Sequence, residues 1–230
     1  VRGRYGSEGE FYPFDNETND GLDTLDWLVE QPWCDGSVGM FGASYLAAVQ
    51  FALAGDNHPG LKALNPQFMS GDIWRQAYYS GGAFSLALTF SWLALEVGSR
   101  TSEAAMTPCL NVKRFFSSRP VLTLDERIGP VSPAFRDYAA HWSRDAYWQA
   151  RDYRPRIARC RTPMLLTAGW YDYYPNENFR NYAALMDGDA PGEVKRQHRV
   201  IVGPWPHGIT ASTKLGDLDF GPEATKEDGS

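Results

Sequence analysis

The sequence predicts an α/β fold, with a parallel sheet interrupted by a helical insertion, and three patterns indicate it. Short apolar runs bounded by Gly or Pro alternate with longer stretches of helical periodicity, which is typical of parallel strands joined by helices. Aromatic side chains then crowd into a mostly helical stretch, after which the strand and helix alternation resumes. We therefore expect a first core segment at 1–69, an inserted helical lid at 70–159, and a second core segment with a polar tail at 160–230.

The first core segment contains two predicted strands and two predicted helices. Apolar side chains at helical spacing predict a helix over 21–30, and a turn at Asp35-Gly36 leads into a short strand at 38–41. The next helix is expected from Ser44 to about residue 54. A second strand follows at 61–64, which the sequence Asn65-Pro66 is expected to close.

The second core segment repeats this rhythm. A buried strand is predicted at 163–169 and runs into Asp172, and a helix with an apolar face follows at 176–186. The last strand, at 199–202, runs into a loop that ends at His207. No element is predicted in the polar tail from 208 onward.

The composition of the chain argues against some classes of binding partner. The chain carries 22 Lys and Arg against 28 Asp and Glu, a net charge of −6, without a basic run. This balance argues against nucleic acid or an anionic membrane surface, and no apolar stretch is long enough to span a bilayer. A small molecule or a short peptide is the expected partner. No signal peptide is visible, which favours a cytoplasmic location, and the three cysteines are expected to be reduced.

The strongest local motif is Gly39-Met-Phe-Gly42-Ala-Ser44-Tyr45, between a predicted strand and a predicted helix. A serine nucleophile is commonly held on such a sharp turn, where Gly42 leaves room for the backbone. The backbone N–H of Tyr45 would then face a developing oxyanion at the helix N-terminus. The motif departs from G-x-S-x-G, because Leu46 stands at the second glycine position. Taken alone, it also fits a serine that merely caps a helix.

The order of three residues along the chain favours catalysis over capping. Ser44, Asp172 and His207 each follow a predicted strand, in the order Ser, Asp, His, with a long insertion between the first two. This is the arrangement of an α/β hydrolase. We expect Ser44 to attack a carbonyl, His207 to carry its proton, and Asp172 to orient the imidazole.

Five motifs resemble the cocaine esterase and X-Pro dipeptidyl-peptidase (S15) group of serine hydrolases. They lie at 2–11, 33–36, 38–45, 169–172 and 203–207. The resemblance implies cleavage of ester or amide bonds through an acyl-enzyme. Within this group, X-Pro dipeptidyl-peptidase and α-amino acid ester hydrolase or acylase activities are alternatives to cocaine-esterase-like activity.

Two departures from the family leave a second hypothesis open. Ala47 stands where the family has glycine, and the family's preceding segment, with the first part of the sheet and a tyrosine that is the second oxyanion donor, is not found here. A β-sandwich that often follows the histidine is also not found. We therefore expect an internal fragment, the second half of the sheet, on which the N- and C-terminal parts of the same polypeptide pack. The alternative is a catalytically silent binding module.

The remaining candidates are weaker. No pair of histidines has metal-ligand spacing, so neither a metal nor a cofactor is expected. His58, His141 and His198 do not follow a predicted strand, and we expect surface or packing roles for them. Cys34 precedes its strand and so lies at the wrong end for a nucleophile. The acidic loop before residue 20 lacks the register of a calcium loop.

Overall fold

The computed structural model describes residues 1–96, 117, 119–127, 132–208 and 210–225. Two compact units are present. The first, which we call the sheet unit, comprises Asn16–Gln76 and Arg151–Ser230. The second, the helical unit, comprises Val1–Asp15 and Ala77–Ala150, and its main part lies within the predicted insertion.

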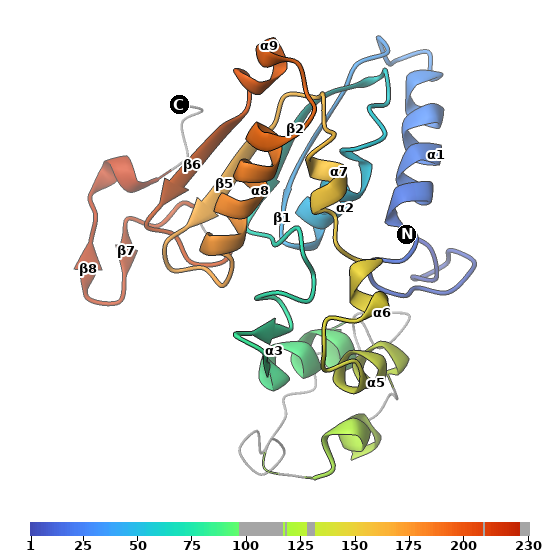
Figure 1. Ribbon diagram of the computed structural model, residues 1–230, viewed down its shortest axis with the longest axis vertical. Coiled ribbons are helices and arrows are strands. Elements are labelled where there is room, and N and C mark those ends of the chain that lie inside the picture. The colour runs from blue at the N-terminus through green and yellow to red at the C-terminus, as the bar shows by residue number, and fades with distance from the viewer. Residues whose placement is uncertain (97–116, 118, 128–131, 209, 226–230) are drawn as a thin grey trace. The chain divides into compact units, whose positions relative to one another are not determined.

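The sheet unit is built on four parallel strands (Figure 1). These are β1 (Val38–Ala43), β2 (Leu61–Gln67), β5 (Leu165–Gly169) and β6 (Arg199–Gly203), in the spatial order β1-β2-β5-β6. The parallel sheet predicted from the sequence is therefore confirmed. Because all four strands run the same way, the loops that follow them meet at one edge of the sheet.

Helices connect and cover these strands. They are α1 (Glu17–Val29), α2 (Tyr45–Leu53), α7 (Arg154–Ile157), α8 (Pro175–Asp187) and α9 (Gly192–Lys195). Helix α2 packs against β1, β2 and α1, and α8 packs against β5. Among the described residues, no helix is long and apolar enough to cross a bilayer; α1 and α8 have 13 residues each.

The core of the sheet unit lies between α2 and the strands. Helix α2 is apolar on nearly every face, and six of its nine residues are buried, which is why this helix can lie inside the unit. The largest fully buried side chains of the sheet unit are Phe51, Leu53, Leu64, Phe68, Ile73 and Ile157.

Strand β2 is longer than predicted. The sequence Asn65-Pro66 was expected to close it, but the strand continues to Gln67, with Pro66 opposite Gly42 in β1. Proline lacks a backbone donor, so it is costly in a regular ladder. Here β2 pairs with β5 at few positions, and the Asn65 side chain itself donates to the carbonyl of Leu165 at 2.5 Å. That side-chain bond takes the place of a ladder contact.

The helical unit has an aromatic core of its own. Its described helices are α3 (Leu86–Phe90), η1 (Ser91–Glu96), η3 (Val121–Arg127), α5 (Pro133–Ala140) and α6 (Ala146–Gln149), with a hairpin of β3 (Tyr79–Ser80) and β4 (Ala83–Phe84). The ring of Tyr138 lies 4.7 Å from that of Tyr78 and 4.8 Å from that of Trp148. These three aromatic residues thus pack together in the core of the helical unit.

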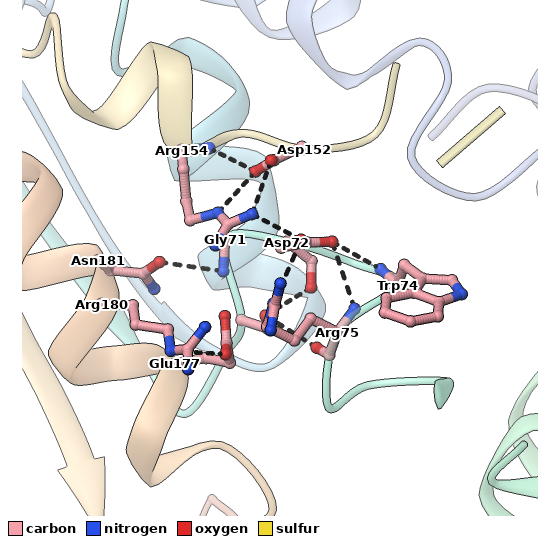
Figure 2. A network of polar contacts seen from close by, with 10 residues as sticks. Gly71, Asp72, Trp74, Arg75, Asp152, Arg154, Glu177, Arg180 and Asn181 are labelled. Carbon is pink, nitrogen blue, oxygen red and sulfur yellow. Dashed lines mark hydrogen bonds and ion pairs between the residues drawn. The ribbon is translucent and has the colours of Figure 1, made fainter. Parts of the chain in front are cut away.

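A buried polar network joins the two segments of the sheet unit that lie on either side of residues 77–150 (Figure 2). The Asp72 side chain is fully buried and accepts a 2.6 Å hydrogen bond from Nη2 of Arg154, which also contacts Asp152 at 2.8 Å. The backbone N–H of Tyr153 donates to the carbonyl of Gly71 at 2.7 Å. Residues 71–72 and 152–154 are therefore held side by side within the sheet unit.

The polar tail contains structure that the sequence did not predict. Strands β7 (Lys214–Leu215) and β8 (Leu218–Asp219) form a small hairpin, followed by η4 (Pro222–Ala224). The indole N–H of Trp205 donates to the carbonyl of Ala224, which anchors the tail to the loop after β6.

Candidate active site

Ser44 lies on a sharp turn between β1 and α2. Its backbone has φ 59° and ψ −123°, a conformation that non-glycine residues adopt at a cost of about 1–3 kcal/mol. The preceding Gly42 has φ 151°, and a Cβ there would lie 2.5 Å from Cβ of Leu46. The turn therefore requires glycine at position 42, as the sequence predicted.

The Ser44 side chain does not cap the helix. Ser44 occupies the position before α2, yet its hydroxyl makes no capping hydrogen bond, so the reading of this residue as a simple helix cap has no support in the geometry. Its backbone N–H donates to the carbonyl of Gln67 at 2.9 Å. This bond holds the turn against the end of β2.

Tyr45 begins α2, so its amide lies at the positive end of the helix dipole. The Tyr45 hydroxyl donates to Oε1 of Glu17, in the first turn of α1. Through this contact, the side chain of Tyr45 holds the first turn of α2 against α1. The amide of Tyr45 therefore lies at the helix end that favours negative charge.

Asp172 and His207 are in direct contact. Asp172 follows β5, His207 follows β6, and Nδ1 of the histidine lies 2.7 Å from Oδ1 of the aspartate. A carboxylate only accepts hydrogen bonds, so Nδ1 carries the donated proton and Nε2 is the nitrogen that can accept one. The Asp172 side chain is fully buried, and among the described residues its Oδ2 has no hydrogen-bond partner.

Close approach of two backbone segments makes this contact possible. Gly169 and Gly203 are paired at the ends of β5 and β6, and the N–H of Tyr171 donates to the carbonyl of Trp205 at 3.2 Å. The Asp172 and His207 loops therefore run alongside each other.

Three aromatic rings surround the imidazole of His207. The ring centroids of Tyr173 and Tyr174 lie 5.6 Å from it, and that of Phe68 lies 6.2 Å away. Burial and the nearby Asp172 carboxylate raise the pKa of Tyr174 above its ordinary value, so this ring stays neutral.

Phe68 also links the histidine to the serine turn, because it directly follows Gln67, the residue that accepts the Ser44 N–H. Sequence reasoning missed it, since β2 was expected to end at residue 64. The three predicted residues thus follow strands at one edge of the sheet unit. The described hydrogen bonds include the one between Asp172 and His207, and none between Ser44 and His207.

The other histidines occupy different surroundings. His58 contacts Asp26 at 3.0 Å, and His141 contacts Asp145 at 2.6 Å. His198 is buried and accepts the Met164 N–H at 3.2 Å, and desolvation lowers its pKa.

Metal ligands and thiols were the other candidates in the part of the chain that the structure describes. There, no three His, Cys, Asp or Glu side chains gather in a group that could hold a metal. Cys34 and Cys160 are free thiols, and Cys109 lies outside the described residues.

Comparison with known proteins gives a consistent picture. The sequence model of the X-Pro dipeptidyl-peptidase (S15 family) matches residues 1–209. The cocaine esterase of Rhodococcus sp. (strain MB1 Bresler) is 36% identical over 240 aligned positions, which cover 98% of this chain and 40% of that protein. The chain therefore spans about two fifths of the length of this relative.

Two solved structures share the fold. An aminopeptidase from the marine sediment archaeon Thaumarchaeota archaeon superposes with a TM-score of 0.81 at 24% identity, over 95% of this chain and 39% of that one. An α-amino acid ester hydrolase superposes with a TM-score of 0.78 at 24% identity, over 95% of this chain and 38% of that one. These similarities confirm the predicted α/β-hydrolase fold.

Proposed function

The chain belongs to the X-Pro dipeptidyl-peptidase (S15) family, and from this premise we propose that it forms the catalytic part of a serine hydrolase that cleaves ester or amide bonds. The contact that carries the proposal is the 2.7 Å hydrogen bond between Asp172 and His207. A buried carboxylate on Nδ1 leaves Nε2 as a base, at the edge of the sheet where the strained Ser44 turn lies.

In the proposed mechanism, Nε2 of His207 takes the proton of the Ser44 hydroxyl as its oxygen attacks the substrate carbonyl. The bond between the carbonyl carbon and the leaving group then breaks, and His207 returns the proton to the leaving group. A water molecule repeats these steps to release the acid. The amide of Tyr45 stabilises the oxyanion, and Asp172 stabilises the imidazolium.

We further propose that other segments of a longer polypeptide complete the site. The chain matches only 40% of the cocaine esterase length, and β1 lies at an edge of the sheet with the Phe41 side chain 81% exposed. A parallel sheet normally has both of its faces covered. The resemblance noted above places a second oxyanion donor, a tyrosine hydroxyl, in such a segment. Its loss from an otherwise complete site would cost about 10²-fold in rate.

Active-site labelling tests the proposal. The full-length protein should react with a fluorophosphonate at Ser44, and Ser44→Ala should abolish labelling while the fold is retained. Ser37→Ala is the matched control, since Ser37 is an exposed serine just before β1, and this variant should label like the wild type. A folded full-length protein that does not label would contradict the proposal and favour a silent binding module.

Esters are the substrate class we propose first, because the relative with 36% identity is an esterase. The family name and the solved relatives leave dipeptidyl-peptidase and α-amino acid ester hydrolase or acylase activities as the competing forms of this proposal. Parallel assays with p-nitrophenyl acetate and with an alanyl-prolyl p-nitroanilide separate esterase activity from dipeptidyl-peptidase activity. Faster Ser44-dependent turnover of the anilide would contradict the ester preference.

A further inference from the structure

The three rings around His207 differ in how much of each remains open to solvent. Phe68 is fully buried and Tyr174 is 6% exposed, so both rings are already covered by the fold. Tyr173 is 55% exposed, although its ring lies as close to the imidazole as that of Tyr174. The rings of Phe68 and Tyr174 therefore pack against His207 within the fold. The ring of Tyr173 leaves an exposed aromatic surface beside it.

We propose that Tyr173 is a specificity-determining residue, whose ring contacts the leaving group and favours alcohols or amines with an aromatic or bulky apolar body. This inference rests on the proposed serine hydrolase function. It concerns the leaving group and not the acyl group, because His207 delivers its proton to the leaving atom.

His207 must deliver a proton to the leaving oxygen or nitrogen, so that atom has to lie within about 3 Å of Nε2. The His207 side chain is 30% exposed, which leaves the imidazole accessible to a substrate. The Tyr173 ring centroid lies 5.6 Å from that of the imidazole, at an angle of 51°. The proposal therefore places the substituents carried by the leaving atom against the exposed ring.

The backbone holds Tyr173 in this place. It directly follows Asp172, whose N–H donates to the carbonyl of Gly169 at 3.2 Å and whose carboxylate is bonded to His207. The Tyr173 ring also contacts that of Tyr174 at 6.0 Å. The ring thus needs little ordering when a substrate binds, so contact with an aromatic group should favour that substrate by about 10-fold.

A neighbouring aromatic residue provides a matched control. Trp170 lies in the same loop and is 60% exposed, but its described ring contact is with Phe179, at 5.8 Å. Truncating Trp170 removes a similar exposed aromatic surface without removing the ring beside His207.

The test compares esters that share one acyl group and differ in the leaving alcohol, using the full-length protein. Benzyl acetate and methyl acetate form the same acyl-enzyme, so the ratio of their kcat/KM values reports on the leaving group alone. Tyr173→Ala should lower this benzyl-to-methyl ratio about 10-fold. Tyr173→Phe, which keeps the ring, and Trp170→Ala should leave it within about twofold of the wild type.

A second ratio separates recognition from positioning. Methyl butyrate and methyl acetate differ only in the acyl group, and Tyr173→Ala should leave their kcat/KM ratio unchanged. An equal loss for all esters would mean that Tyr173 only positions His207, and would overturn the inference while the proposed function stands. An unchanged benzyl-to-methyl ratio would overturn it as well. Absence of Ser44-dependent turnover in the wild type would instead overturn the proposed function, and the inference with it.

Discussion

Substituting Gly169 by alanine tests whether the close approach of two loops aligns Asp172 with His207. Gly169 ends β5, three residues before Asp172. A Cβ at this position would lie 2.9 Å from the carbonyl carbon of Trp205 and closer still to its oxygen. These are backbone atoms of the segment that leads to His207, so they cannot rotate away as a flexible side chain would.

Relief of this clash requires the two loops to separate by about 1 Å, a displacement that typically costs about 10²-fold in rate at an active site. The hydrogen bond between Asp172 and His207 starts at 2.7 Å and would not survive such a shift unchanged. Overpacking should also destabilise the fold by about 1–3 kcal/mol. We therefore expect Gly169→Ala to lower kcat for p-nitrophenyl acetate about 100-fold and to lower the urea midpoint.

Gly39→Ala is the matched control, because a Cβ at that strand glycine would meet its nearest neighbour, the carbonyl oxygen of Ala63, at 3.9 Å. This variant should retain wild-type kcat, with stability unchanged or raised by up to about 1 kcal/mol. Wild-type kcat and an unchanged urea midpoint for Gly169→Ala would refute the argument that the spacing of these loops controls the catalytic contact.

Two further predictions concern stability. Arg154→Ala leaves the fully buried Asp72 carboxylate without its 2.6 Å partner and should destabilise the protein by about 3–5 kcal/mol in urea unfolding. Arg156→Ala on the same helix removes only a half-exposed pair with Asp56 and should cost less than about 1 kcal/mol, so equal effects would contradict the role of burial. Burial lowers the pKa of His198, so the unfolded chain binds a proton more readily, and stability should fall as the pH drops below about 6.5. Urea midpoints measured from pH 7.5 to 5 should fall less steeply for His198→Gln, and an unchanged slope would contradict this assignment.

Local patterns were sufficient for most elements of the sheet unit. Strand β1, helix α2 and helix α8 were each located within about three residues, because hydrophobic periodicity, glycine and proline act over short distances. Strand β2 was predicted to end too early, since a proline usually closes a strand. The tail hairpin of β7 and β8 was missed because its two-residue strands have no periodicity to detect.

For the candidate site, too, some features could be predicted from the sequence and others could not. Sequence alone indicated that Ser44, Asp172 and His207 each follow a strand, because turn motifs and strand ends are encoded locally. It did not indicate which side chains would surround His207, and Phe68 in particular was not recognised. That ring reaches the imidazole because β2 extends to Gln67 and the chain turns there, which depends on the register between strands.

Local sequence patterns were thus sufficient to predict the fold class, the order of the three candidate site residues and their positions at strand ends. The side-chain contacts, in contrast, could be identified only in the folded chain. The contact between Asp172 and His207 joins residues 35 apart in the chain, and that between Asp72 and Arg154 joins residues 82 apart. Such contacts depend on how strands and helices pack together, and no short stretch of sequence encodes that packing. The position of the exposed Tyr173 ring beside the contact between Asp172 and His207 is a result of this packing.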